Sequence, residues 1–433
     1  MAMSAISLAC RKLLDPLLNA QSTRERWIYI FTLLLHVGFY VYILFSALGK
    51  APRYIGSLVS LTGLLGYYAL DYNNSNLKRL GALKWIYFIF LAYLLFKVFH
   101  NIHISNGWYG FKTNIHQGFA LFFIGLEIVK NHKDIVRLIV LFCIAGFYQG
   151  LDGIYQWFTG VDFINGYEVN RWHGGVRLTG SMKTPRIGNY LSLVVPMAMG
   201  FWWVLPQHWS RLTRFGMLVL LLFPPIFLLI GSQTRSGILG AFCAVLIFFI
   251  LFQGFSWKQL ILASGVAIWA LFWGFKRTAW ETLMQDPRFS EVWPHALAVF
   301  KSAPILGVGL NSYNPGVHSL GLEFVRESSF LQHPHNIYLQ FLCEMGIVGL
   351  IILLVFYGSY LMWSLDKMRH GLKNSAKNKA WIMTACFWAS FLGYMVTAIS
   401  GHDFFRTWWL GLALSILGVV MGSCLTLIKQ HKN

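Results

Sequence analysis

Residues 332–358, QHPHNIYLQFLCEMGIVGLIILLVFYG, pass from polar residues into one of the most apolar parts of the chain. The apolar run continues to about residue 364, and a helix of that length crosses the ~30 Å hydrocarbon core of a membrane. His333 and His335 flank Pro334 where the change happens. The stretch therefore predicts a spanning helix, and leaves open whether its histidines are a catalytic device or only the helix's polar edge.

The composition extends this prediction to the whole chain. Hydrophobic residues make up 56% of the 433 residues and charged residues 12%, and a water-soluble domain carries about twice that charge. The apolar runs do not alternate with polar residues, as the strands of a membrane barrel would. We therefore predict an all-α polytopic membrane protein in which residues 1–433 form a single integral membrane domain.

Apolar windows of spanning length recur along the chain and predict about twelve transmembrane helices. We expect them at about 27–48, 54–71, 85–100, 114–129, 136–158, 187–205, 216–231, 236–252, 259–275, 340–364, 381–399 and 408–428. Two longer gaps remain between these spans. They predict a large loop with short helices at 276–339, between the ninth and tenth spans, and a smaller loop at 159–186.

Lysine and arginine orient the spans, because cytoplasmic loops carry an excess of both. With the N-terminus in the cytoplasm, more than half of the 35 Lys and Arg residues fall on the cytoplasmic side. An even number of spans returns the C-terminus to the same side. Both loops of the preceding paragraph then lie outside the cytoplasm.

The cations on the predicted external side gather in three places. The first is the loop 159–186, which holds Arg177, Lys183 and Arg186. The second is the segment at Arg235, and the third is the loop 276–339. External loops usually avoid cations, so this concentration predicts a cationic cavity and an anionic partner. Arginine is favoured where paired hydrogen bonds hold a phosphate or carboxylate.

Two of these arginines stand where helices are expected to begin. In GSQTRSG, residues 231–237, Arg235 precedes a helix that we expect to start near Ser236. In SMKTPRIGNY, residues 181–190, Pro185 fits a first helical turn, which places Arg186 at the helix's positive end. A cation there is unfavourable unless an anion is bound, so both segments predict phosphate sites. The alternative for each is a turn anchored at the lipid headgroups.

The loop 276–339 has internal structure of its own. Trp293, Leu297 and Phe300 follow helical spacing and predict a short helix with an apolar stripe, just downstream of Arg288. PILGVG, residues 304–309, predicts a turn with close backbone approach.

The proline in QHPHN predicts where the following helix begins. A residue before proline tends to be extended, and proline is favoured at the first helical position. We therefore expect His333 outside the helix, Pro334 at its start and His335 in its first turn. The helix dipole there favours a neutral imidazole that can accept a proton. The alternative is a histidine that bonds backbone at the membrane interface.

The segment SGHDFFRTWW, residues 400–409, joins the last two spans on the external side. His402, Asp403 and Arg406 either complete the cavity or form a local salt bridge, and the salt bridge is the simpler interpretation. Two histidines without a third nearby ligand do not make a metal site. The six cysteines contain no CxxC pair. We therefore predict no metal site and no disulfide.

HNIYLQFLCEMGIVGL resembles the signature of the O-antigen ligase family and of its relatives, the O-antigen polymerases and protein O-oligosaccharyltransferases. His335 and Asn336 stand at the family's spacing from Gly346 and Gly349. SQTRSG, and the run from Arg288 to the glycines of PILGVG, resemble two further landmarks. The resemblance covers about residues 187–360 well.

This resemblance implies an inverting, metal-independent and cofactor-free glycosyltransferase of the membrane-embedded class C type. It would transfer O-antigen glycan from undecaprenyl pyrophosphate to a sugar hydroxyl of lipid A-core, on the periplasmic face of the bacterial inner membrane, completing lipopolysaccharide. The family's essential histidine corresponds to His335 as general base, and its essential arginines to Arg186, Arg235 and Arg288 as pyrophosphate ligands. We expect further substrate contacts from His333, Asn336, Arg177, Lys183, Asp403 and Arg406.

Two alternatives remain. An O-antigen polymerase would show the same motifs while joining two lipid-linked glycans. A lipid-linked oligosaccharide flippase or other transporter would use charged residues within the spans, such as Glu127, Asp152 and Glu344, as proton relays. The expected partners are the lipid-linked donor, the lipid A-core acceptor and membrane lipids, and we expect no nucleic acid.

Overall fold

The computed structural model describes residues 20–172, 175–253, 286–324, 332–374 and 379–432, with the isolated positions 15, 18, 261 and 265. These residues are helical almost throughout. The described strands are β1 (Asn170–Trp172) and β2 (Gly175–Arg177), which pair as one antiparallel hairpin. The structure therefore agrees with an all-α membrane protein.

Seven segments in the described part of the chain are long and apolar enough to cross a membrane. They are α2 (Thr23–Phe45), α8 (His132–Thr159), α10 (Arg211–Gly231), α11 (Arg235–Phe248) with η5 (Phe249–Gln253), α16 (Ile337–Gln340) with η7 (Phe341–Met345) and α17 (Gly346–Asn374), α18 (Lys379–Thr397) and α19 (Thr407–Lys432). The chain is therefore a multi-pass membrane protein.

Four other expected spans also coincide with helices, which do not meet the same standard of length and hydropathy. They are α3 (Lys50–Asp71), α5 (Leu83–Phe99), η2 (Ile115–Phe119) with α7 (Ala120–Ile128), and α9 (Ile187–Ala198) with η4 (Met199–Trp203). The expected span 259–275 lies outside the described residues. The count of twelve therefore stays a prediction.

The shorter elements complete the described chain. They are η1 (Tyr72–Asn74), α4 (Asn76–Arg79), α6 (Ile104–Asn114), η3 (Gly180–Met182), η6 (Arg288–Val292), α14 (Trp293–Ser302) and α15 (Tyr313–Ser319). The expected short helix of the loop 276–339 is thus present as α14. The rest of that expected loop includes residues 276–285 and 325–331, which lie outside the described residues.

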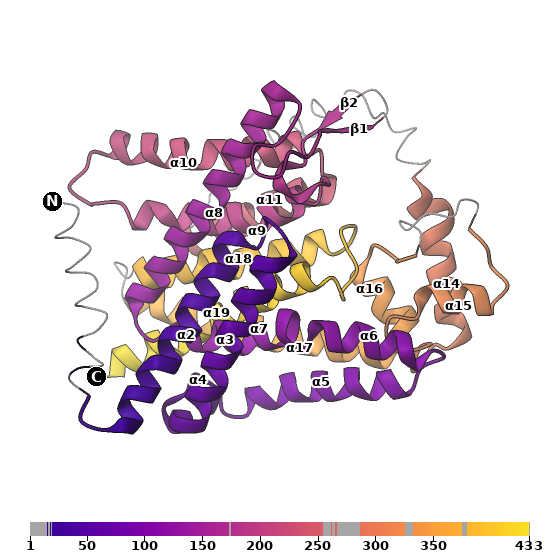
Figure 1. Ribbon diagram of the computed structural model, residues 1–433, viewed down its shortest axis with the longest axis horizontal. Coiled ribbons are helices and arrows are strands. Elements are labelled where there is room, and N and C mark those ends of the chain that lie inside the picture. The colour runs from indigo at the N-terminus through magenta and orange to yellow at the C-terminus, as the bar shows by residue number, and fades with distance from the viewer. Residues whose placement is uncertain are drawn as a thin grey trace.

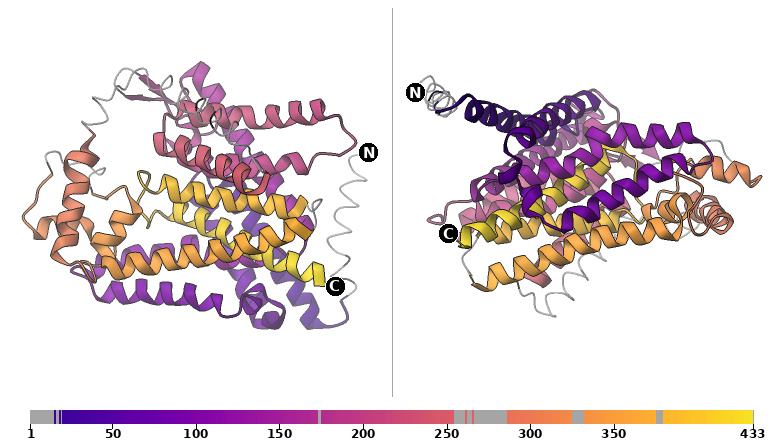
Figure 2. Two further views of the ribbon diagram at one scale, coloured as in Figure 1. Left: turned by 180° about the vertical axis from the view of Figure 1, so that it is seen from behind. Right: turned by 90° about the horizontal axis from the view of Figure 1, so that it is seen from below.

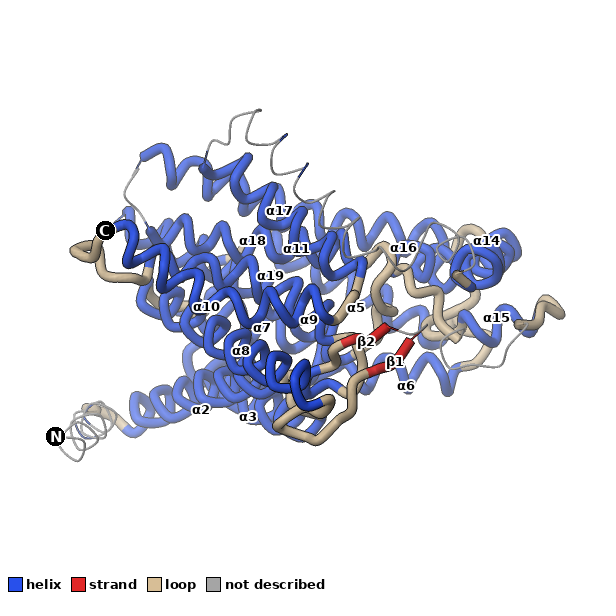
Figure 3. Tube along the Cα trace, turned by 90° about the horizontal axis from the view of Figure 1, so that it is seen from above, coloured by secondary structure: helices blue, strands red, loops and turns tan. Residues whose placement is uncertain are grey.

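Many of the long helices run along the longest axis of the molecule, which is horizontal in Figure 1. The short helices α14, α15 and α16 gather at one end of this axis, and α2 begins and α19 ends at the other (Figures 1 and 2). Seen from above, α2 and α3 lie at one edge and α17 at the opposite edge, with α18 and α19 between them (Figure 3).

The central helices are more deeply buried than the helices at the edges. The apolar window of α19 is 89% buried and that of α18 is 78% buried, whereas those of α2 and α10 are 28% and 22% buried. The central helices are therefore packed on all sides, and the outer ones leave apolar surface that suits lipid. A second, small apolar core joins α14 and α15 to η7 through Val292, Val299, Tyr313 and Cys343.

The local sequence explains where α8 begins and ends. The Asn131 side chain accepts a hydrogen bond from the Lys133 backbone N–H at 2.9 Å, and Asp134 Oδ2 accepts one from the Asn131 N–H at 3.0 Å. This capping box satisfies N–H groups that a helix start otherwise leaves unbonded. The helix ends at Gly160, whose φ of 83° is the left-handed conformation that glycine adopts without strain.

The PILGVG turn makes the close backbone approach that the sequence predicts. Val308 N–H donates to Cys343 O at 3.1 Å, Gly309 N–H to Glu344 O at 2.8 Å, and Ile347 N–H to Pro304 O at 2.9 Å. The turn thus lies directly against the junction between η7 and α17. At that junction Gly346 has φ 70° and ψ −175°, a conformation almost restricted to glycine.

We expect Gly346→Ala to destabilise the protein strongly. A Cβ at this position would lie 2.1 Å from Ile305 O, and the backbone conformation alone costs about 1–3 kcal/mol for other residues. The measurement is thermal unfolding of purified protein in detergent. The matched control is Gly358→Ala in the same helix, where a Cβ meets nothing within 4 Å. Equal unfolding midpoints for the two variants would contradict the prediction.

Candidate functional site

Two helix starts lie side by side, and each carries one of the expected arginines. Arg186 is the N-cap of α9, and Arg235 is the first residue of α11. Thr234 Oγ1 donates to Pro185 O at 2.7 Å, and Ser236 Oγ donates to Asn189 Oδ1 at 3.3 Å. This junction brings two positive helix ends together, and each favours an anion.

Arg177 belongs to the same region. It lies at the end of β2, and its Nε and Nη2 donate to the carbonyls of Ser232 and Gln233 at 3.1 and 3.3 Å. Burial lowers the pKa of the Arg177 guanidinium, and the charges of Arg235 and Arg288 lower it further. These three arginines, from separate segments of the chain, therefore share one electrostatic environment.

Arg288 is held on two sides. Its guanidinium pairs with Asp286, with Nη2–Oδ2 at 2.5 Å and Nε–Oδ1 at 2.9 Å. Its Nη1 donates to Ser400 O at 3.0 Å and to Ser400 Oγ at 2.7 Å. Burial alone would raise the pKa of Asp286, but the hydrogen bonds and charge of Arg288 outweigh it and lower the pKa. Asp286 therefore stays ionised and fixes the arginine's orientation.

The structure corrects the expected start of the helix in QHPHN. Pro334 and His335 precede the helix, and Asn336 is its N-cap, with Oδ1 accepting from the N–H groups of Tyr338 at 3.0 Å and Leu339 at 3.1 Å. Asparagine caps a helix by this pair of bonds, and the cap therefore prevails over the preference for proline at the first position.

Backbone contacts fix the position of Pro334 and His335 outside the helix. Trp293 Nε1 donates to Pro334 O at 3.0 Å, which ties the segment to α14. His335 has a φ of 52°, a left-handed conformation that is uncommon for a residue other than glycine. Such a conformation costs energy and is held by its surroundings, often at functional sites.

The loop between α18 and α19, residues 398–406, links the arginines to the histidines. His335 is buried, with Nδ1 3.4 Å from Gly401 O, and the neighbouring residue Ser400 binds Arg288. Ile337 N–H donates to Ala398 O at 3.0 Å. Arg288 and His335 therefore contact successive residues of a single loop.

The same loop contains the salt bridge that the sequence favoured. Arg406 Nε lies 2.8 Å from Asp403 Oδ2. The pair nevertheless lies among the other expected site residues, because both its members act on Arg186 and His333. Burial lowers the pKa of Arg186, and the charge of Arg406 lowers it further. Burial also lowers the pKa of His333, which favours its neutral form.

His402 is a buried member of this group that the resemblance did not mark. Burial lowers its pKa well below the usual range, and the charges of Arg186, Arg406 and the two histidines of QHPHN act in the same direction. Its place directly before Asp403 in SGHDFFR was the only signal in the sequence. Ser400 carried no signal of its own, since its role depends on a contact with the distant Arg288. Asp286 pairs with Arg288 two residues along the chain, a local contact that the motifs did not mark.

The Lys183 side chain contacts an aromatic ring of the loop that precedes β1. It has a left-handed backbone, with φ 63°, and its Nζ lies 5.9 Å from the centre of the Tyr167 ring. This cation–π contact places it against the segment before β1. The side-chain oxygen of Asn336 accepts the two capping bonds, so a substrate would contact the amide nitrogen of this side chain.

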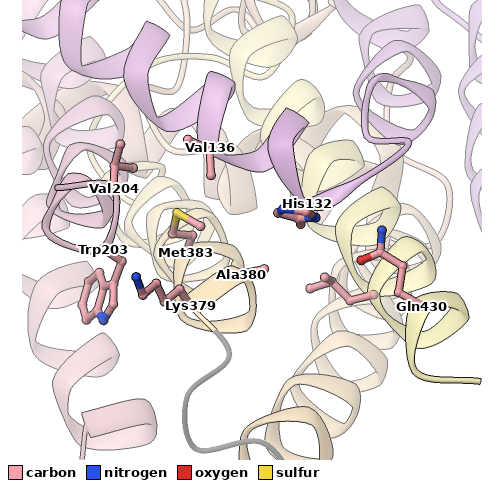
Figure 4. Close-up of a pocket in the computed structure, with 9 residues that line it drawn as sticks. His132, Val136, Trp203, Val204, Lys379, Ala380, Met383 and Gln430 are labelled. Atoms are coloured by element: carbon pink, nitrogen blue, oxygen red, sulfur yellow. The ribbon is translucent and has the colours of Figure 1, made fainter. Parts of the chain in front are cut away.

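The described residues of this region contain no group of metal ligands. Within the described ranges, no three His, Cys, Asp or Glu side chains are grouped as metal ligands, and the five described cysteines are free. A cavity of about 440 Å³ lies at the opposite end of the molecule, where α8 begins and α19 ends (Figure 4). Its lining includes His132, Trp203, Lys379 and Gln430, and contains none of the expected site residues.

Comparison with known proteins agrees with the motifs. Residues 220–354 match the family model described as "O-Antigen ligase". The chain carries an O-antigen ligase family domain. Over 130 residues it is 30% identical to a Rickettsia conorii protein named "Putative polysaccharide ligase", and the match covers 29% of each chain. The family match includes Arg235, Arg288 and His335, whereas Arg186 and the loop 398–406 lie outside it.

We expect Asn336→Ala to weaken the start of α16 by about 1 kcal/mol, because it removes both capping bonds. Asn336→Ser keeps a capping oxygen and should lose only a few tenths of that. Thermal unfolding in detergent measures the difference. If the serine and alanine variants unfold at the same temperature, the side chain does not act as a cap.

Proposed function

We propose that this chain is an O-antigen ligase that transfers a glycan from undecaprenyl pyrophosphate to a sugar hydroxyl of lipid A-core. The observation that carries the proposal is the loop 398–406, which contacts Arg288 through Ser400 and His335 through Gly401. A cationic group and a proton acceptor are thus held beside each other. The family domain over residues 220–354 supports glycan ligation in general.

Arg186, Arg235 and Arg288 would bind the donor's pyrophosphate. Two of them stand at adjacent helix starts, where backbone N–H groups also favour an anion. Fixed donors of this kind stabilise the charge that develops on the leaving group, and they need no reorganisation during the reaction. Arg177 would add positive potential to the site without binding the donor directly, because its guanidinium donates to the Ser232 carbonyl of the turn before α11.

His335 would act as the general base. A neutral imidazole accepts the proton of the acceptor hydroxyl while the hydroxyl oxygen attacks the anomeric carbon of the donor sugar. The pyrophosphate leaves from the opposite side of that carbon. That geometry gives inversion at the anomeric carbon. His333 and His402, whose pKa values burial lowers, would keep the surroundings of the base free of extra positive charge.

The placement of this site at one end of the molecule supports a periplasmic reaction. The short helices α14 to α16 lie at that end, and α2 begins and α19 ends at the other. The distribution of lysine and arginine favours a cytoplasmic position for the end where α2 begins and α19 ends. The active site would therefore face the periplasm of the inner membrane, where both lipid-linked substrates are exposed.

We expect His335→Ala to lower the rate of transfer from lipid-linked donor to purified lipid A-core by about 10²–10⁴-fold, the usual contribution of a general base. The control is His370→Ala in α17, where the histidine side chain is 72% exposed. Both variants should elute as folded protein. Wild-type transfer by folded His335→Ala would rule out the catalytic role.

We expect Arg235→Ala to impair the use of donor more than Arg235→Lys does. Lysine keeps the charge and loses the paired hydrogen bonds of guanidinium. The measurement is the initial rate against donor concentration at saturating acceptor. Equal loss in both variants would show that geometry alone matters, and no loss in either would remove Arg235 from the donor site.

A ligase and a polymerase differ in what accumulates when the gene is deleted. Loss of a ligase should leave long lipid-linked polymer that never reaches lipid A-core. Loss of a polymerase should leave single glycan units attached to lipid A-core. Electrophoresis of lipopolysaccharide and of the lipid-linked pool distinguishes the two, and single attached units would overturn the assignment to the ligase branch.

A further inference from the structure

Asp286 binds Arg288 in the way that a phosphate group would. Asp286 Oδ2 lies 2.5 Å from Arg288 Nη2, and Asp286 Oδ1 accepts from Arg288 Nε at 2.9 Å and from the Arg288 N–H at 3.0 Å. Two parallel N–H···O bonds along one edge of a guanidinium are the arrangement by which arginine holds carboxylates and phosphates alike. The carboxylate of Asp286 therefore occupies an edge of Arg288 that is suited to a phosphate.

The other side of the Arg288 guanidinium is engaged as well. Its Nη1 donates to Ser400 O at 3.0 Å and to Ser400 Oγ at 2.7 Å. A phosphate that binds Arg288 through paired hydrogen bonds must therefore displace Ser400 or Asp286. Ser400 is neutral, whereas Asp286 is ionised and would repel a phosphate at close range. Asp286 is therefore the partner that a phosphate would replace.

The charge of Asp286 acts on more than one arginine of the candidate site. Burial opposes the ionisation of Asp286, yet the hydrogen bonds and charge of Arg288, together with the charge of Arg235, lower its pKa. Arg177 in turn interacts electrostatically with Arg235 and Arg288. Asp286 thus offsets part of the repulsion within a cluster of three cations, which is also what a bound pyrophosphate would do.

The ion pair can be reached from outside the protein. The side chains of Arg288 and Asp286 are 23% and 16% exposed. A partly exposed ion pair loses little when solvent or a competing ion replaces one partner, whereas a fully buried pair loses several kcal/mol. An anion that enters the site can therefore exchange with the carboxylate.

We propose that Asp286 is an internal competitor of the donor: it holds the edge of Arg288 that the donor's pyrophosphate takes over, and it is released when the donor binds. The inference rests on the proposed function, because it takes Arg288 as a pyrophosphate ligand. Before the donor binds, the carboxylate keeps Arg288 paired and oriented. Since binding must first break this ion pair, Asp286 lowers the apparent affinity of the site for pyrophosphate.

The test measures the binding of inorganic pyrophosphate to purified protein in detergent and metal-free buffer, by isothermal titration calorimetry. Asp286→Asn keeps the size of the side chain and removes its charge, and we expect it to bind pyrophosphate about tenfold more tightly than wild type. Weaker binding by this variant would show that Asp286 only orients Arg288, and unchanged binding would exclude competition. The matched control is Asp366→Asn in α17, which removes an aspartate that pairs with Lys367 at 2.9 Å and should bind as wild type.

A double variant separates competition for Arg288 from a general effect of charge. In Arg288→Gln protein the guanidinium is gone, so the carboxylate has nothing to occupy. Adding Asp286→Asn to this variant should then change the affinity for pyrophosphate by less than about twofold. A gain of about tenfold in this background as well would show that Asp286 acts through its charge alone, and would overturn the proposal.

A structure of wild-type protein with bound pyrophosphate tests the exchange without any variant. Phosphate oxygens should lie on the Nε and Nη2 edge of Arg288, and the Asp286 carboxylate should lie beyond about 4 Å from it, the limit of an ion pair. An intact contact between Asp286 and Arg288 in that structure would overturn the proposal.

The outcomes also separate this inference from the donor site on which it rests. Binding that is lost in Arg235→Ala, and is unchanged or weaker in Asp286→Asn, would overturn the competition and leave the donor site intact. Absence of pyrophosphate binding in both wild type and Asp286→Asn would contradict the donor site and, with it, the inference.

Discussion

A single buried carboxylate, Glu344, joins the short helices to the spanning helices. It is 1% exposed, and its oxygens accept from Asn311 N–H at 3.0 Å, from Tyr313 N–H at 3.1 Å and from Gln340 Nε2 at 3.2 Å. Gln340 Oε1 in turn accepts from Phe404 N–H at 2.7 Å. Because an unbonded carboxylate is very costly in such a place, these segments are bound to one arrangement. The positions of His335 and of the loop 398–406 depend on it.

The two other acids of the proton-relay alternative, Glu127 and Asp152, also accept hydrogen bonds from backbone groups. Glu127 accepts from the N–H groups of Asn76 at 3.0 Å and Leu77 at 2.7 Å, and it pairs with Lys130 at 2.7 Å. Asp152 accepts from Phe163 N–H at 2.7 Å. A proton relay needs acids that change partners during transport, whereas these hold loops to helix ends. Their contacts favour a fixed external site over a pathway through the membrane.

The sequence predicted features that depend on local composition and failed where distant segments meet. Apolar length located the spanning helices, and turn residues located the starts of α9 and α11 near Arg186 and Arg235. The start of α16 was misplaced because proline and asparagine both favour helix starts. The capping bonds of Asn336, and the bond from Trp293 to Pro334, decide which residues stay outside the helix. The role of Ser400 depends on a contact with Arg288 across 112 residues of chain. The burial of His402 depends on packing that no local pattern records.

The candidate site extends beyond the matched family domain. Residues 220–354 contain Arg235, Arg288 and His335, yet each is positioned by residues outside that range. Thr234, next to Arg235, bonds Pro185 of the α9 start, while Arg288 and His335 contact the loop between α18 and α19. A domain limited to the matched residues would therefore carry the proposed reactive groups with only some of the partners that orient them. Since a displacement of about 1 Å in a catalytic group can cost 10²-fold in rate, the flanking helices are part of the site's chemistry.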